Sequence, residues 1–129
     1  MGFEFTRLVD GDDGETHLVE VDLPVSFVPG SHVSVAPLPV TKMTYVEYPE
    51  DREQITPGWH PTPHPRHFMM SLVGGFEITT TSGDTKRFGP GDWVLCDDLT
   101  GKGHITRGLP GRRVNLVVDV PDDWEIPDS

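Results

Sequence analysis

The residues of this chain best suited to chemistry are histidines. Four of the six, His60, His64, His67 and His104, lie between residues 60 and 104. A neutral imidazole can accept a hydrogen bond, take up a proton near neutral pH or bind a divalent transition metal. The first three lie in or just after a proline-rich connection, and His104 belongs to a distant segment. If the fold brings them together, they could form a site for a metal ion or for a small organic ligand.

Two aspartates precede His104 in the glycine-containing loop 97–103. Asp98 could act as a general base, or it could orient His104 through the second ring nitrogen. An Asp ahead of Thr-Gly can equally accept backbone N–H bonds and cap a loop. We expect capping for Asp97 and leave both interpretations open for Asp98. Asp98 and His104 are therefore the candidate catalytic residues.

Two cations lie near these residues in the sequence. In a chain of net charge −11, a cation that points into a cleft would attract a carboxylate ligand. We expect Lys102 to be a solvated loop lysine. Arg66 is a candidate for ligand binding, and its alternative is an ion pair with one of the many acidic side chains.

Large apolar side chains surround the same segments, and most of them belong to the core. Strand alternation places His67 and Met69 on one face and Phe68 and Met70 on the other. Met69 is therefore a candidate pocket wall beside His67. The candidate ligand-binding residues are Trp59, Thr62, Arg66, Met69 and Trp93.

The elements that must position these residues are short strands. Gly (14) and Pro (13) make up about a fifth of the 129 residues, which disfavours long helices. Valine-rich and aromatic stretches between turns predict strands over 3–8, 16–23, 26–28, 31–35, 41–48, 66–73, 76–81, 85–88, 93–96, 104–107 and 114–120. A long connection spans 49–65, and an acidic tail covers 121–129 with Trp124 as an anchor. Such spacing predicts one all-β domain over residues 1–129, an antiparallel sandwich or barrel.

Composition excludes several functions. The net charge of −11 opposes binding to nucleic acid and to anionic membranes, and no apolar run is long enough to span a bilayer. The first residues show no signal-peptide pattern. A single cysteine, Cys96, cannot form an internal disulfide, so we expect a cytoplasmic protein in which Cys96 is a packing residue. We expect a homodimer, because a small barrel leaves open strand edges.

Three stretches of the chain form a pattern of histidines, glycines and turns. The first comprises His60-Pro61-Thr62, Arg66-His67-Phe68 and Leu72-Val73-Gly74. The second is Arg87-Phe88-Gly89-Pro90-Gly91-Asp92, and the third is Asp98-Leu99-Thr100-Gly101-Lys102-Gly103-His104. Together they resemble the cupin family of small jelly-roll barrels. The likeness covers residues 59–107 and implies a single antiparallel jelly-roll barrel. It is most similar to a subgroup of small, mostly uncharacterised cupins.

The resemblance implies a site inside the barrel. His60, His67 and His104 occupy the first-histidine, glutamate and last-histidine positions of the cupin pattern, and Thr62 replaces the second histidine. The implied site is a set of three histidines for a divalent transition metal such as Fe, Ni, Cu, Zn or Mn, with His64 as a competing ligand. The implied function is binding of a small organic molecule, neutral or anionic, by a metal-dependent enzyme of dioxygenase, isomerase or lyase type. The alternatives are a metal-free ligand-binding barrel and a structural interaction module.

Overall fold

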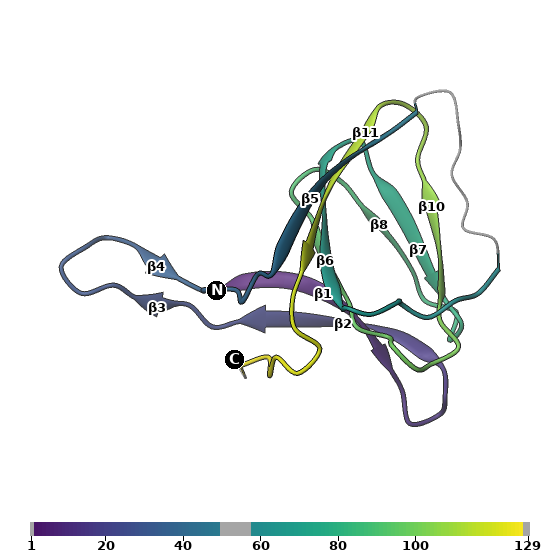
Figure 1. Cartoon of the computed structure of the whole chain (residues 1–129), viewed down its shortest axis with the longest axis horizontal. Coiled ribbons are helices and arrows are strands. Elements are labelled where there is room, and N and C mark those ends of the chain that lie inside the picture. The colour runs from purple at the N-terminus through teal and green to yellow at the C-terminus, as the bar shows by residue number, and fades with distance from the viewer. Residues whose placement is uncertain (1, 50–57, 128–129) are drawn as a thin grey trace.

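The computed structural model describes residues 2–49 and 58–127, and its regular elements are β-strands (Figure 1). They are β1 (Phe3–Asp10), β2 (Thr16–Leu23), β3 (Ser26–Phe27), β4 (Ser34–Val35), β5 (Lys42–Tyr48), β6 (His67–Val73), β7 (Phe76–Thr80), β8 (Thr85–Phe88), β9 (Trp93–Cys96), β10 (His104–Gly108) and β11 (Arg113–Asp119). Glycine at positive φ closes several turns, as at Gly83 between β7 and β8. Within the described residues, no helix is long and apolar enough to cross a membrane.

The strands form two facing sheets. The larger sheet has the order β2-β1-β9-β6-β11-β5, and the smaller has the order β10-β7-β8. Among the described residues, the strands of these two sheets pair antiparallel except for β1 with β9, which run parallel. Each strand therefore turns one row of side chains toward the opposite sheet and the next row away from it.

Two apolar clusters lie on the two faces of the larger sheet. The inner core fills the space between the sheets and comprises Leu8, Phe76, Ile78, Phe88, Val94 and Cys96. The outer core lies on the other face and comprises Phe5, Leu23, Phe68, Leu95, Val118 and Val120. Segment 36–38 and the C-terminal segment cover the outer core, through residues such as Leu38 and Trp124. Both faces of the central strands β1, β9 and β6 are thus covered, and each large buried side chain contributes about 2 kcal/mol.

A two-stranded arm, β3 and β4, projects from the body of the molecule (Figure 1). Residues 24–41, which contain it, include no Asp, Glu, Lys or Arg, and Phe27 and Val33 are exposed. Its base reaches the outer core through Ala36 and Leu38. The arm therefore lies apart from the interior face on which the histidines gather.

The fold confirms the all-β, jelly-roll prediction, with a parallel β1–β9 pair in a fold expected to be antiparallel. Strand alternation was also predicted correctly in β6, where Phe68 enters the outer core and Met69 packs on the inner core. The strand expected over 31–35 is shorter, because Ser31 turns back to hydrogen-bond to Val28 and β4 begins at Ser34. Part of the connection predicted over 49–65, residues 50–57, lies outside the described residues.

Candidate functional site

His104 and Asp98 form a buried pair on the interior side of the smaller sheet. Asp98 is 0% exposed and His104 is 5% exposed. Nδ1 of His104 lies 2.6 Å from Oδ2 of Asp98, and Thr62 donates its hydroxyl to Oδ1 of the same carboxylate at 2.6 Å. The carboxylate thus holds two side chains from different segments in one network. Of the two roles left open for Asp98, the structure places its side chain against the ring of His104.

The loop that carries Asp98 is anchored from a neighbouring strand. Asp10 accepts hydrogen bonds from the backbone N–H groups of Thr100 and Gly101 and from the Thr100 hydroxyl. Gly103 follows at φ +101°, and a Cβ there would lie 2.1 Å from the carbonyl of His60. Glycine is therefore required, because the loop passes directly over the His60 backbone.

That close approach brings His60 beside His104. The two residues exchange both backbone hydrogen bonds, at 3.3 and 3.0 Å, and their ring centroids are 5.0 Å apart. Nδ1 of His60 lies 3.1 Å from the carbonyl oxygen of Pro61. Nε2 of His60 is buried and has no hydrogen-bond partner in the part of the chain that the structure describes.

The hydrogen-bond partners of the two rings indicate which ring nitrogen carries the hydrogen. Pro61 O and the Asp98 carboxylate are both acceptors, so in the neutral form of each ring Nδ1 carries the hydrogen and Nε2 carries the lone pair. For His104, no described residue makes a hydrogen bond to Nε2. The pair therefore offers two neighbouring Nε2 acceptors, and the Asp98 carboxylate would stabilise His104 if it took up a proton.

The other predicted metal ligands are placed differently. His67 begins β6 on the interior face with Met69, is half-buried, and has Nδ1 3.3 Å from the carbonyl of Pro65. His64 is exposed and pairs with Asp122 at 2.5 Å. Among residues 2–49 and 58–127, no three His, Cys, Asp or Glu side chains are grouped to hold a metal ion. His60 and His104 supply two imidazoles, whereas catalytic metal sites generally use three protein ligands. The described donor set therefore falls short of a metal site, and the metal stays a prediction.

The side chain of Arg66 makes its hydrogen bonds to other residues of the chain. The side chain is buried and donates to Pro121 O at 2.9 Å, to Asp97 at 3.1 Å and to Trp124 O, and its guanidinium stacks on the Trp124 ring at 5.6 Å. This corresponds to the ion-pair alternative considered for Arg66 rather than to ligand binding. Asp97 also binds Arg7, at 2.9 Å, so its carboxylate holds two arginines rather than capping the loop.

The remaining predicted ligand-binding residues do not gather at one place. Met69 packs on the inner core, whereas Trp93 packs on the outer core and lines a groove of about 190 Å³ with Glu4, Lys86 and other residues. Trp59 is 51% exposed. Burial, followed by the charge of Asp98, raises the pKa of the Cys96 thiol far above its usual range, so Cys96 packs and does not act as a nucleophile.

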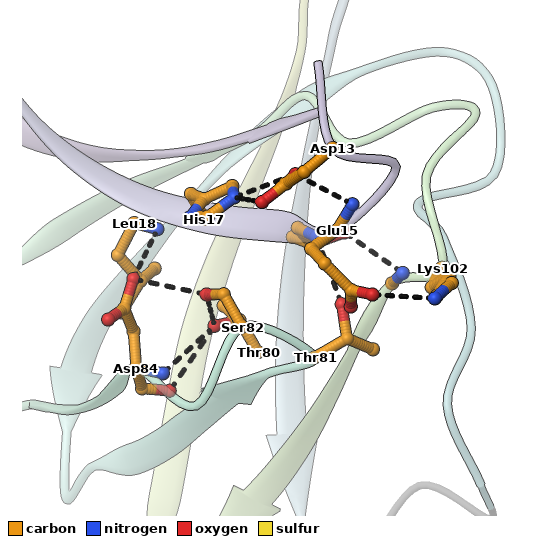
Figure 2. Close-up of polar contacts among 11 residues, drawn as sticks. Asp13, Glu15, His17, Leu18, Thr80, Thr81, Ser82, Asp84 and Lys102 are labelled. Atoms are coloured by element: carbon orange, nitrogen blue, oxygen red, sulfur yellow. Dashed lines mark hydrogen bonds and ion pairs between the residues drawn. The ribbon is translucent and has the colours of Figure 1, made fainter. Parts of the chain in front are cut away.

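A surface cluster ties the loop before His104 to the β1–β2 turn (Figure 2). Lys102, expected to be solvated, donates to Glu15 at 2.5 Å, and His17 pairs with Asp13 at 2.9 Å. Asp84 accepts the backbone N–H of Leu18 at 3.2 Å. These contacts are exposed and connect chain turns, so they support the site loop from outside the barrel.

The interior also holds two polar residues that sequence reasoning missed, Arg113 and Asn115. They are 4% and 5% exposed. They alternate with Val114 and Leu116 along β11, so they share the face that Val117 turns toward Met69. That alternation is the sequence signal that could have revealed them: Asn115 lies within the strand expected over 114–120, and Arg113 directly precedes it.

Among known proteins, the chain shows a distant structural similarity. No family model matches the chain, and no curated protein matches it. A solved structure of ethanolamine utilization protein Q from Salmonella typhimurium is similar over 95% of this chain and 99% of that chain, at 14% identity and a TM-score of 0.40. Because the identity and the TM-score are this low, the function of that protein is not assigned to this chain.

Proposed function

We propose that this chain is a cupin-type barrel that binds a small organic ligand through Nε2 of His60 and His104. The observation that carries the proposal is the buried Nε2 of His60, which finds no partner among the described residues although its ring lies beside the His104–Asp98 pair. Buried polar atoms are nearly always hydrogen-bonded in native proteins. A ligand hydroxyl or N–H group would donate to these two nitrogens.

The His104–Asp98 pair gives the site a second capability. A ligand O–H or C–H group placed at Nε2 of His104 could transfer its proton to the ring, and Asp98 would stabilise the resulting imidazolium. We therefore propose His104 as the general base and Asp98 as the residue that positions it. A barrel that binds the same ligand without turnover is the second candidate, and it needs the same two nitrogens.

The proposal is tested by measuring the NMR shifts of the imidazole nitrogens. Protein with ¹⁵N-labelled histidine is titrated with a panel of charged and uncharged small hydroxy compounds at millimolar concentration, and NMR reports the nitrogen shifts. A binding compound is expected to shift Nε2 of His60 and His104, and His104→Gln should weaken its binding by about tenfold or more. The matched control is His17→Ala, because His17 lies on the surface.

Metal content is measured on the same untagged protein. A metal that copurifies in stoichiometric amount and is lost in His104→Ala would support the metal-dependent prediction. Ligand shifts at His60 and His104 in metal-free protein would support the metal-free barrel. If no panel member shifts either ring and no metal is present, the proposed function fails.

A further inference from the structure

Exposed apolar side chains gather in one segment of the chain. Ten large hydrophobic residues are exposed among the described residues, and seven of them lie between residues 25 and 45. Phe27 in the arm and Met43 in β5 are each 64% exposed. Apolar residues scattered singly over a surface are common, whereas apolar residues gathered in one place indicate an interaction surface. The seven are Val25, Phe27, Val33, Val35 and Val40 in residues 24–41, and Met43 and Tyr45 in β5.

The arm does not bury these side chains by folding on itself. It projects away from the body of the molecule (Figure 1), and its strands pair over two residues each, Ser26 with Val35 and Phe27 with Ser34. Directly paired residues share a face of a ribbon, so Phe27 lies on one face and Val35 on the other. Both faces are therefore apolar and exposed, and an isolated two-stranded hairpin is marginally stable at best in water. The arm thus calls for a covering surface outside its own body.

Strand β5 presents a second apolar surface directly after the arm segment. It is the edge strand of the larger sheet, at the opposite edge from β2. Met43 and Tyr45 pair with β11 residues that form or flank the outer core, so both exposed side chains lie on the outer face. The next residue of this row, Glu47, pairs with Arg112 at 3.4 Å. The exposed outer row of β5 is therefore apolar, and its one charge is balanced.

The distribution of charge identifies a second copy of this chain as the occupant. Two copies of net charge −11 repel one another, so they associate most readily where the contact keeps their acidic side chains apart. Residues 24–41 contain no Asp, Glu, Lys or Arg, although such residues make up 24% of the chain. A different partner of so acidic a protein would be attracted by basic groups set against its acidic ones. The uncharged arm offers no acid to such a partner, and it brings no repulsion into a contact with a second copy.

We propose that the arm of one copy packs across Met43 and Tyr45 of a second copy, and that the second copy returns the same contact. Such a twofold arrangement covers both surfaces of both copies at once and closes the assembly as a dimer. Phe27 is the anchor of the contact, because a large aromatic side chain buries the most apolar area. The contact lies on the outer face, whereas His60 and His104 lie inside the barrel, so the inference is independent of the proposed function.

Sedimentation equilibrium of the whole chain tests whether the dimer forms. From about 1 to about 100 μM, the wild-type protein is expected to reach twice the mass of the chain. Salt screens the repulsion between copies and does not weaken an apolar contact, so raising the ionic strength from about 0.05 to about 0.5 M should leave the dimer equal or tighter. A monomer at about 100 μM, or a dimer that dissociates as salt is added, would overturn the inference.

Two substitutions place a charge in each half of the contact. Phe27→Asp should weaken dimerisation by at least about thirtyfold, and Met43→Asp by about tenfold. Both side chains are exposed, so the melting temperature of dilute, monomeric protein should stay the same. The matched control is Val19→Asp, because Val19 is 40% exposed on β2, at the other edge of the sheet. A dimer that tolerates both Phe27→Asp and Met43→Asp, or that is lost equally in Val19→Asp, contradicts the proposed contact.

Mixed variants test whether the arm meets β5. In the twofold arrangement, a mixed dimer of Phe27→Asp with Met43→Lys brings the two introduced charges together at one contact and keeps both native residues at the other. It should form at least about tenfold more tightly than the mixed dimer of Phe27→Asp with Met43→Asp, in which the introduced charges repel. Val19→Lys and Val19→Asp make the same change of net charge on β2, and their mixtures with Phe27→Asp should differ by less than about twofold. Equal association of the two Met43 mixtures would overturn the docking of the arm on β5.

Vesicles of neutral phosphatidylcholine test the alternative occupant, a lipid surface. Wild-type protein is mixed with the vesicles and sedimented, and Phe27→Asp is the comparison. Dimeric wild-type protein is expected to stay in solution, because its apolar arm is covered by the second copy. Monomeric protein that binds the vesicles and loses this binding in Phe27→Asp would make the arm a membrane contact and overturn the inference.

Discussion

Replacing Asp98 with asparagine should disrupt the site more than its small change in shape suggests. Asp98 is fully buried and accepts from Thr62 and from His104, each at 2.6 Å. Asparagine keeps one oxygen but turns an NH₂ group toward the other donor. One hydrogen bond to a charged acceptor is lost and a buried donor is left without a partner, so the free energy of unfolding should fall by about 2–3 kcal/mol. For a domain of this size that corresponds to a melting temperature lower by roughly 6–12 °C.

Two measurements check this prediction for Asp98→Asn. Chemical denaturation gives the free energy of unfolding, and ¹⁵N NMR of the imidazole shows whether Nδ1 of His104 still carries the hydrogen. Thr62→Val removes only one donor and should cost less, about 1 kcal/mol. Asp12→Asn is the matched control, because Asp12 lies in an exposed turn. A loss below about 0.5 kcal/mol with the Nδ1 proton retained would refute the reasoning, since such a loss is typical of an ordinary surface substitution.

Three further changes probe other parts of the molecule. Gly108→Ala places a Cβ against Nη1 of Arg113 and should lower the free energy of unfolding by about 1–3 kcal/mol in urea denaturation; an unchanged midpoint would contradict the tight fit. The hydrogen bond to Asp13 raises the pKa of His17 in the folded protein. The pair therefore stabilises the fold at a pH below the pKa of histidine in the unfolded chain, and this stabilisation is lost as the pH rises through the folded pKa. An NMR titration should find a lower pKa for His17 in folded Asp13→Asn than in the wild-type protein. Arg66→Met removes the donors that hold the C-terminal segment and should increase its proteolysis; resistance equal to wild type would count against this role.

The fold could be predicted from local patterns because turn residues and the alternation of side chains along a strand depend only on short stretches of sequence. The alternation of Phe68 and Met69 in β6 needed only a period of two. The environment of Arg66 could not be predicted in the same way, because Asp97, Pro121 and Trp124 are distant in sequence and meet it only in the folded chain.

The polar interior was missed for a related reason. Val114, Leu116 and Val118 form an apolar row along β11, and a strand with one apolar row is normally expected to expose the other. In this fold β11 lies next to β6, where both faces of the larger sheet are covered, so the second row, with Arg113 and Asn115, is buried as well. His60 and His104 were singled out as candidates because their residue type is itself a signal, whereas arginine and asparagine in a strand are not.

The guanidinium of Arg113 has consequences for how this barrel can evolve. It occupies the space left by Gly108 on β10, and a Cβ at Gly74 would lie 2.9 Å from its Cγ and 2.4 Å from a backbone oxygen. A larger residue at Gly108 collides with the arginine, and a smaller residue at Arg113 leaves a void. Substitutions at these two positions should therefore be accepted in pairs, so that lineages in which Gly108 has gained a side chain will also have lost Arg113.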